Sequence, residues 1–205
     1  MHPEQHPASP TNYTRGRDGS PITGIVLHVM DGTLTGTDAW FANPKAKVSA
    51  HYGVGRHGEI HQYVDEADTA WHAGDWGVNL STIGIEHEGR QNGGTPYWAP
   101  TLEQLLASVR LAASICHRHG IAPDPDTLLR HSEINPDHAL CPGPGFPLEL
   151  YIGMTRELIE GPLRLGSFRP LVTHAPDPHI DDAVHVASVT VHGSSLKLDV
   201  RKEKA

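Results

Sequence analysis

The stretch ITGIVLHV, residues 22–29, decides the fold of this chain. Its residues are β-branched or otherwise apolar almost throughout, which is the pattern of a strand buried in the centre of a sheet. The segment that follows, MDGTLTGTDAWF, places Thr37 or Asp38 where either would cap a short helix. A buried strand that leads into a helix predicts an α/β fold, in which functional side chains gather at strand ends.

Hydrophobic periodicity predicts further strands and helices along the chain. Alternation with period two predicts strands, and apolar residues at helical spacing predict helices. The expected elements are a hairpin of residues 48–56 and 59–64, strands at 82–88 and 127–131, and helices at 101–119 and 148–160. Thr101 to Gln104 resembles a capping box and Gly120 a C-cap, so both ends of the first of these helices are marked in the sequence.

Composition indicates one globular domain with many loops. The chain has 205 residues, of which 38% are apolar, together with 21 glycines and 17 prolines. Its formal net charge is −8 with no run of five or six like charges, so we do not expect nucleic acid among its partners. No apolar stretch is long enough to span a membrane, so we do not expect membrane insertion. Residues 1–20 form a polar leader that lacks the apolar core of a signal peptide, so we expect synthesis in the cytoplasm.

Two histidines and a cysteine from separate motifs form a set of metal ligands. His28 ends the first strand, His131 ends the strand at 127–131, and Cys141 opens the loop CPGPGF. Two imidazoles and one thiolate suit zinc, and three protein ligands with an open fourth position are the catalytic form of a zinc site. Cys116 lies at an apolar helix position, so we expect it to fill the core rather than to pair with Cys141.

Six motifs carry a resemblance to a known family. They are IVLHVMDG, VSAHYGVGRHGEIHQYV, TAWHAG, STIGIEHEG, LLRHSEINP and CPGPGF, in that order. With them the chain resembles the zinc-dependent N-acetylmuramoyl-L-alanine amidases, which include phage endolysins, cytoplasmic amidases that recycle anhydromuropeptides, and peptidoglycan recognition proteins. The resemblance implies a central mixed β-sheet flanked by helices, with a zinc cleft at the strand ends, over a catalytic domain of residues 21–160.

Carried over by motif, the resemblance assigns roles to single residues. His28, His131 and Cys141 would bind one zinc ion per chain, and Glu86 in IGIEHEG would be the catalytic glutamate. A carboxylate near the metal suits the base that takes a proton from water and hands it to the leaving amine. Alternation places Glu88 on the same face of the strand, so motif position alone favours Glu86.

Further residues are expected to line the substrate cleft. Trp71 and His72 in AWHAG match residues that line it in the family, and His51 in SAHY lies on the cleft side. Many members carry a lysine two residues before the third ligand, where this chain has Ala139. Either zinc supplies most of the stabilisation of the oxyanion, or His138, His51 or His72 replaces the lysine.

The resemblance implies hydrolysis of the amide bond between N-acetylmuramic acid and L-alanine in peptidoglycan. We expect a lytic enzyme of a phage or prophage that reaches the cell wall after its release. One alternative is a cytoplasmic enzyme that recycles anhydromuropeptides, and another is a module that binds muropeptides without cutting them. A purely structural zinc site would need a fourth protein ligand, for which His138 is the candidate.

The composition changes after residue 160. Four prolines without a clear period indicate a linker from residue 161, and the segments 183–193 and 195–201 alternate like a two-stranded β-ribbon. A lone hairpin is marginally stable in water. We therefore expect this C-terminal extension to pack on the catalytic domain or to pair between two chains as a homodimer.

Overall fold

A computed structural model describes residues 2–90, 98–160, 185–192 and 195–201. The chain divides into two compact units, residues 1–159 and residues 160–205, and each is described by itself. The first unit carries every residue to which the sequence assigns a role in the site. Within the described residues, no helix combines the length and the apolar character that a membrane crossing requires.

A six-stranded mixed sheet forms the centre of the first unit, as predicted. In sheet order its strands are β1 (Glu4–Gln5), β5 (Ile60–Gln62), β4 (Tyr52–Val54), β7 (Thr82–His87), β3 (Gly24–Val29) and β8 (Leu128–Arg130). The hairpin strands β4 and β5 pair antiparallel, and the other neighbours pair in parallel. Within ITGIVLHV, residues Gly24–Val29 form β3, and all of them are buried between β7 and β8.

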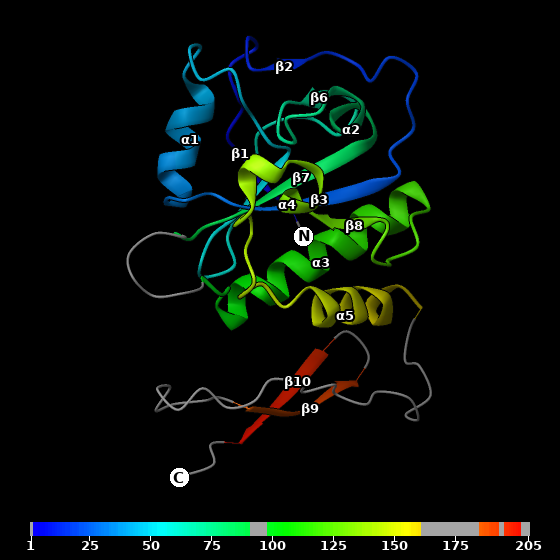
Figure 1. The fold of residues 1–205 in the computed structure, drawn as a ribbon. Helices are drawn as coiled ribbons and strands as arrows, with labels where there is room; N and C mark the ends of the chain where they lie inside the picture. Colours follow the sequence, from blue (N-terminus) through cyan, green and yellow to red (C-terminus); the bar gives the residue numbers. More distant parts are fainter. Residues whose placement is uncertain (1, 91–97, 161–184, 193–194, 202–205) are drawn as a thin grey trace. The chain divides into compact units, whose positions relative to one another are not determined.

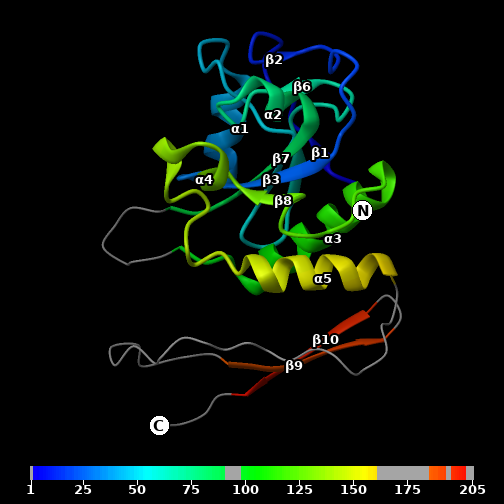
Figure 2. The ribbon, with the colours of Figure 1, turned by 45° about the vertical axis from the view of Figure 1, so that its right-hand side comes forward.

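Helices lie on both sides of this sheet. They are α1 (Leu34–Ala42), α2 (Trp76–Ser81), α3 (Leu102–His119), α4 (His131–Ile134) and α5 (Leu148–Glu160), with a 3-10 helix η1 at Pro136–His138. The two long helices α3 and α5 cover one side, whereas α1, α2, α4 and the small sheet of β2 (Tyr13–Thr14) and β6 (Thr69–Ala70) lie on the other (Figure 1, Figure 2). The loops on the α4 side therefore build the site.

Helix α1 begins earlier than the sequence indicated. Thr33 is its N-cap, because the Thr33 side chain accepts a hydrogen bond from the backbone N–H of Gly36. The expectation that Thr37 or Asp38 caps this helix is therefore wrong, and both residues lie inside it. Competing Thr and Asp residues in DGTLTGTD made the cap ambiguous, since each of these side chains can cap a helix.

Helix α3 has the predicted ends, but the side chain of Gln104 does not complete the capping box that its position indicated. Thr101 caps the helix by accepting from the backbone N–H of Gln104, and Gly120 ends it in the left-handed conformation at φ 66°. The Gln104 side chain donates to the carbonyls of Val54 and Glu88, at 2.8 and 3.0 Å. It therefore ties α3 to β4 and to the segment after β7.

The second unit contains two strands in the described residues. Strand β9 (His185–His192) pairs antiparallel with β10 (Ser195–Arg201), with an irregularity between Asp199 and Val200. The predicted linker lies outside the described residues. Packing of this extension on the catalytic domain, and a homodimer formed through it, stay predictions.

Candidate metal centre and active site

The structure brings His28, His131 and Cys141 together at the ends of the parallel strands. His28 lies near the end of β3, His131 is the first residue of α4, which follows β8 directly, and Cys141 comes shortly after η1. One ligand atom from each residue lies within 4.8 Å of the other two. Both imidazoles are buried and the thiol is partly exposed, so the group is open to a substrate from the Cys141 side.

Hydrogen bonds hold the two imidazoles in a defined orientation. Nε2 of His28 lies 3.1 Å from Nδ1 of His72, and Nε2 of His131 donates to the carbonyl of Ala73 at 3.2 Å. With both Nε2 atoms engaged, Nδ1 of each ring is left for a metal. Nδ1 of His28 lies 3.8 Å from the sulfur of Cys141. Such outer contacts are what orients histidine ligands in metal sites.

The electrostatics of the three residues fit a bound cation. Burial, followed by the neighbouring His72 and His131, holds the pKa of His28 well below its ordinary value, and burial lowers the pKa of His131 to about 4. Both rings are therefore neutral, which is the form that binds metals. Burial and the nearby Glu86 raise the pKa of Cys141 to about 12, so its thiolate requires a positive charge such as that of zinc.

Glu86 lies on β7 directly beside this group. Its Cα is paired with that of His28 across the parallel strands β3 and β7. The next residue, His87, contacts Ser108 of α3 on one face of the sheet, so alternation directs Glu86 to the opposite face. Oε2 of Glu86 is buried without a hydrogen-bond partner, and burial raises the pKa of this carboxyl to about 8. It is therefore a carboxyl group that can both take up and release a proton near neutral pH.

Glu88, which shares the face of Glu86, has a partner in the fold. Its Oε2 accepts a hydrogen bond from the backbone N–H of Arg56 at 3.1 Å, and the residue is half-buried. The structure thus separates two carboxylates that alternation alone could not separate. Glu86 has an unpartnered oxygen beside the metal group, whereas Glu88 fixes the β4–β5 turn.

His72 contacts His28 from inside the fold. It is buried, and its Nε2 lies 3.4 Å from Oγ1 of Thr82 while its Nδ1 faces His28. Gly84 makes room for this ring, because a Cβ on Gly84 would lie 2.6 Å from Cγ of His72. Trp71 is half-buried and donates from Nε1 to Oγ1 of Thr14 at 3.0 Å. Contact of either residue with a substrate stays a prediction.

His51 lies beneath the site. It is fully buried, and its Nδ1 accepts from the backbone N–H of Gly84 at 3.0 Å. Its Nε2 lies 2.7 Å from Nη2 of Arg17 and 3.2 Å from the carbonyl of Asp68. Because both ring nitrogens are engaged inside the fold, His51 has no polar side-chain atom free for a substrate in this structure.

Two residues that support the site carry no signal in the sequence. Arg17, in the polar leader, donates to the carbonyls of Leu80 and Thr82 at 2.9 and 3.1 Å. Asn79 accepts through Oδ1 from the backbone N–H groups of His72 and Ala73. Both fix loops around the metal group from positions that are distant in sequence or outside any periodic pattern.

His138 is the exposed member of the three histidines considered as replacements for the lysine. It lies in η1, and its ring stacks on that of His131 with centroids 4.4 Å apart. Ala139 beside it is exposed as well. His138 is not part of the group whose donor atoms meet within 4.8 Å. It therefore lies beside the metal centre on its outer side, and not in the position of a fourth ligand.

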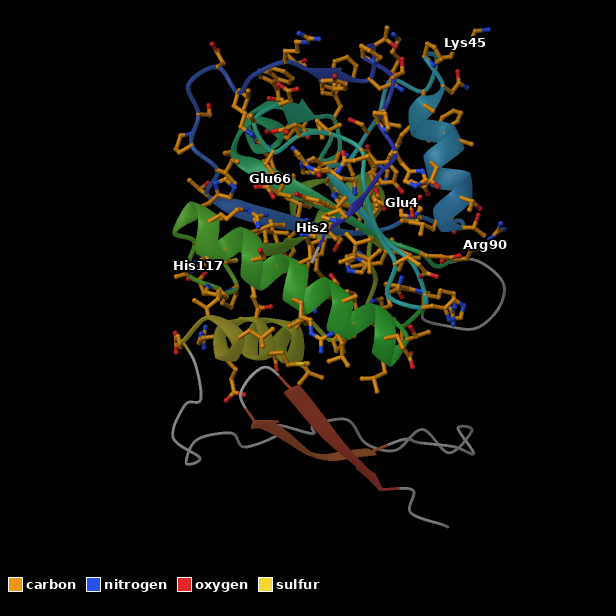
Figure 3. The ribbon with its side chains drawn as sticks, turned by 180° about the vertical axis from the view of Figure 1, so that it is seen from behind. His2, Glu4, Lys45, Glu66, Arg90 and His117 are labelled. Carbon is orange, nitrogen blue, oxygen red and sulfur yellow. The ribbon has the colours of Figure 1, made fainter. Side chains whose placement is uncertain are left out.

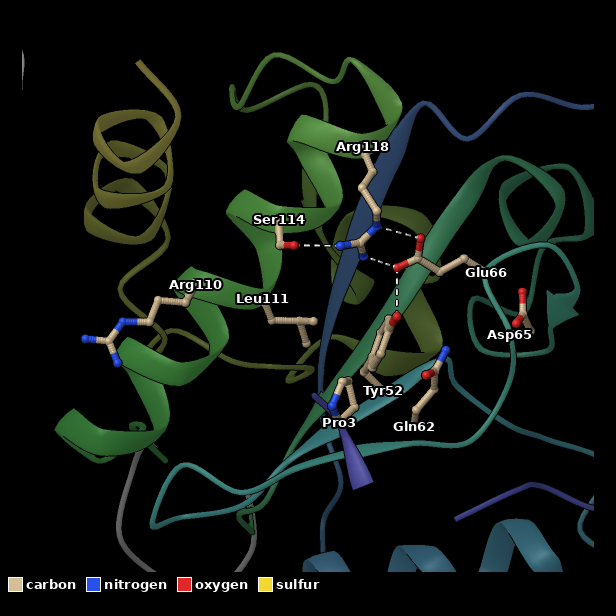
Figure 4. A pocket seen from close by; sticks show the side chains of 9 residues that line it. All are labelled: Pro3, Tyr52, Gln62, Asp65, Glu66, Arg110, Leu111, Ser114 and Arg118. Atoms are coloured by element: carbon tan, nitrogen blue, oxygen red, sulfur yellow. Dashed lines mark hydrogen bonds and ion pairs between the residues drawn. The ribbon is translucent and has the colours of Figure 1, made fainter. Parts of the chain in front are cut away.

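A separate pocket lies beside α3, away from the metal group. It has a volume of about 280 Å³ and lies between α3 and the β5 region (Figure 4). Tyr52, Glu66 and Arg118 form a hydrogen-bonded group in its lining. None of the residues predicted for the site lines this pocket, so it is distinct from the metal group.

Three residues that could hold a metal ion, beside a carboxyl group with one buried oxygen that has no hydrogen-bond partner, match the arrangement of a catalytic zinc site in a hydrolase. A family model described as N-acetylmuramoyl-L-alanine amidase matches residues 18–144, which is more than half of the chain. The chain therefore belongs to the N-acetylmuramoyl-L-alanine amidase family.

Relatives of known name are similar over much of the first unit. N-acetylmuramoyl-L-alanine amidase A of Achromobacter lyticus is 40% identical over 117 residues, which cover 57% of this chain and 62% of the relative. The amidase AmiD of Escherichia coli is 36% identical over 151 residues, covering 69% and 53%. The chain thus spans less than two thirds of the length of these two relatives. The 1,6-anhydro-N-acetylmuramyl-L-alanine amidase AmpD of Enterobacter cloacae is 30% identical, covering 69% and 84%.

Solved structures share the fold. A selenomethionine derivative of AmpD has a TM-score of 0.61 and 27% identity, covering 74% of this chain and 93% of its own. Escherichia coli AmiD, in complex with the substrate anhydro-N-acetylmuramic acid-L-Ala-D-gamma-Glu-L-Lys, has a TM-score of 0.58 and 28% identity, covering 68% and 60%. The endolysin LysCS from Clostridium intestinale, at 21% identity and a TM-score of 0.55, covers 75% and 95% and shows the fold alone.

Proposed function

We propose that this chain is a zinc-dependent amidase that hydrolyses the bond between N-acetylmuramic acid and L-alanine in peptidoglycan or in muropeptides. The observation that carries the proposal is the meeting of His28, His131 and Cys141 beside Glu86, whose buried Oε2 has no hydrogen-bond partner. The family supports it, and so does AmiD, whose solved complex holds a muropeptide of this type.

His28, His131 and Cys141 would hold one zinc ion. When bound, zinc supplies Lewis acidity toward the scissile carbonyl and toward the attacking water. Glu86 takes a proton from that water and returns it to the nitrogen of the leaving L-alanine. A pKa raised by burial to about 8 suits both transfers near neutral pH, because the carboxylate binds the proton and can release it again.

His138 is our proposed donor to the carbonyl oxygen of the substrate. It is exposed, it stacks on His131, and it precedes Ala139, which occupies the position where many members carry lysine. A donor near the carbonyl stabilises the negative charge that develops on the oxygen. His51 and His72 are buried with partners of their own, which leaves His138 as the accessible candidate of the three.

For the biological role we propose a lytic enzyme that acts on the cell wall after release from the cytoplasm. Cys141 as third ligand and the additional segment after residue 160 support this role, because the resemblance associates cysteine at that position with the phage and recognition branches. The second candidate is recycling of soluble anhydromuropeptides, favoured by the likeness to AmpD over 84% of that relative. A module that only binds muropeptides is disfavoured because Glu86 and Cys141 are both present.

Digestion of two substrates tests the activity and separates the two roles. Purified peptidoglycan and soluble anhydromuropeptide are incubated with the protein, with and without a chelator, and the products are read by mass spectrometry. Release of stem peptides beginning with L-alanine from the intact sacculus, abolished by the chelator, supports the lytic enzyme. Cleavage of the soluble substrate alone supports recycling. Cleavage of neither substrate by zinc-loaded protein would overturn the amidase proposal in favour of the binding module.

A further inference from the structure

A second group of metal-binding side chains lies at the outer edge of the sheet. It consists of Glu4 on β1, His6 just after it, and His61 on β5, and their ligand atoms all lie within 4.8 Å of one another. The backbone brings them together, because Glu4 and His61 are paired across the parallel strands β1 and β5. Figure 3 shows Glu4 at this edge. Strands β4 and β7 separate β5 from β3, so this group is distinct from the metal centre at His28.

The donor atoms of this group face one another. Nε2 of His6 lies 3.1 Å from one carboxylate oxygen of Glu4, and Nε2 of His61 lies 3.9 Å from the other. Nε2 of His6 is buried and makes no hydrogen bond, although the Glu4 oxygen is near. Two imidazole nitrogens and a carboxylate thus lie around one point, and one of the nitrogens, Nε2 of His6, has no hydrogen bond.

Asp38 of α1 contacts the Nδ1 atoms of both imidazoles. Nδ1 of His61 donates to Oδ1 of Asp38 at 2.9 Å, and Nδ1 of His6 lies 3.5 Å from Oδ2. Tyr63 donates to the same carboxylate at 2.9 Å and fixes its position. A carboxylate that contacts Nδ1 fixes the orientation of the ring and leaves Nε2 facing the position of the metal. This is the outer arrangement that accompanies histidine ligands in metal sites.

We propose that Glu4, His6 and His61 bind a second divalent transition-metal ion, for which zinc is the natural probe, with Asp38 as the residue that orients both histidines. Two imidazoles and one carboxylate form an established zinc ligand set that leaves a position for water. The rings now stack with centroids 3.8 Å apart and an interplanar angle of 5°. Binding requires them to splay so that both Nε2 lone pairs converge.

The surroundings permit this adjustment. Glu4 is largely exposed and His6 is partly exposed, and both belong to a short edge segment, whereas His61 is nearly buried. The bound ion would connect β1, β5 and, through Asp38, α1. Its effect would be to fasten the N-terminal segment to the sheet, with no part in the chemistry at Glu86.

Metal stoichiometry tests the proposal. Protein without an affinity tag is stripped with a chelator, dialysed against micromolar zinc chloride and analysed for bound metal. We expect two equivalents per chain in the parent and one in His6→Ala and in Glu4→Gln, the second of which removes a charge at an exposed position without a large change in shape. His57→Ala, which removes an exposed histidine outside both groups, should retain two.

Amide exchange locates the second ion. The backbone N–H of His6 donates to the carbonyl of Gln62 at 2.9 Å, so its exchange reports the attachment of this segment. In Cys141→Ala, which lacks a ligand of the first centre, zinc should slow this exchange at least several-fold, and in Cys141→Ala combined with Glu4→Gln it should not. One equivalent in the parent, or two retained in both His6→Ala and Glu4→Gln, would overturn the proposal and leave an ion-paired histidine cluster.

Discussion

Glu86 and Glu88 differ by one contact, and this contact sets their expected importance. Replacing Glu86 with Gln should leave the bound metal unchanged and lower kcat by about 100-fold or more, because a general base typically contributes 10²–10⁴ in rate. Release of L-alanyl peptides from muropeptide, measured beside the metal content, checks this. Glu88→Gln should lose little activity, since the carboxylate of Glu88 accepts a hydrogen bond from the backbone N–H of Arg56. Comparable losses in the two variants would remove Glu86 from its role.

Cys141 should couple metal binding to proton release. Its pKa is raised to about 12 by burial and by Glu86, so the thiol is protonated in the metal-free protein and must lose its proton when zinc binds. Calorimetry in two buffers of different ionisation enthalpy should therefore detect about one proton released at this centre. Cys141→Ala should lose one equivalent of zinc together with this release. Cys116→Ala, on α3, should retain both, and a Cys141→Ala protein with full metal would exclude the thiol as a ligand.

Ala139 offers a test of the donor to the substrate oxygen. Because His138 is the proposed donor, we expect Ala139→Lys at this exposed position to leave kcat nearly unchanged in the parent, and to restore kcat in His138→Ala, where the loss is the roughly 100- to 1,000-fold that one such donor is typically worth. Ala139→Met has a similar length without the charge and should have no such effect. Steady-state hydrolysis of muropeptide measures both. A clearly raised rate in Ala139→Lys alone would show that the native site lacks a donor, and it would remove His138 from that role.

Among the secondary-structure elements, β3 and β7 were predictable because their patterns are strong. Their apolar residues and alternation define strands, and parallel pairing then places His28 beside Glu86. The cap of α1 was not predictable, since several residues of DGTLTGTD are equally good caps, and Asp38 serves a tertiary contact instead. Local patterns therefore give the elements, whereas the partners of polar side chains depend on the assembled fold.

A chain of buried hydrogen bonds connects α5 and α3 to the strand that carries Glu86. Tyr151 contacts Ser108 at 2.8 Å, Ser108 lies 2.7 Å from Nε2 of His87, and Nδ1 of His87 donates to the carbonyl of His28 at 2.8 Å. The hydrogen bonds therefore run from the helices on one side of the sheet to the backbone of a proposed metal ligand.

Ser108→Ala should break this chain and destabilise the protein. The substitution leaves Nε2 of the buried His87 without its partner, whereas Tyr151 keeps its hydrogen bond to the backbone carbonyl of Ser108; an unpaired buried group costs about 2 kcal/mol of unfolding free energy. Urea denaturation measures it. Ser114→Ala, at an exposed position of the same helix, is the matched control and should change stability by less than about 0.5 kcal/mol. Equal effects of the two substitutions would mean that these buried hydrogen bonds contribute nothing to stability.

On the scale of the whole molecule, Glu66 connects the region after β5 to the C-terminal end of α3 (Figure 4). Burial opposes its ionisation, but hydrogen bonds from Arg118, His119 and Tyr52 outweigh burial and lower the pKa of Glu66 below 4.5. A carboxyl group with a lowered pKa in the folded state stabilises the fold above its unfolded pKa. That contribution is lost as the pH falls through the lower folded value.

Glu66→Gln should therefore be less stable than the parent at pH 7, with a gap that narrows toward pH 3. Urea midpoints of both proteins across this range measure the gap. Glu103→Gln, an acidic residue exposed in the first turn of α3, serves as the control and should show a much smaller pH-dependent difference. A gap between parent and Glu66→Gln that stays constant with pH would contradict the assignment.

Much of the site was predictable from motifs, because each motif lies on one short segment. The contacts that complete it join residues far apart in the chain, such as Arg17 with His51 or Glu4 with His61. No spacing or periodicity in the sequence encodes such a meeting, since it depends on which strands become neighbours. The motifs placed His51 on the cleft side, and its burial and its contact with Arg17 are visible only in the assembled fold; a contact of His51 with substrate stays a prediction.

The outer edge of the sheet is formed by β1, a strand of two residues bracketed by Pro3 and Pro7. Open strand edges are where folded chains add to one another and polymerise. Proline has no backbone N–H to offer, so a foreign strand laid against β1 finds little to pair with. The N-terminal segment thus covers the edge of β5 and leaves few backbone groups free to pair with a further strand. We expect this to protect the folded chain from aggregation along this edge.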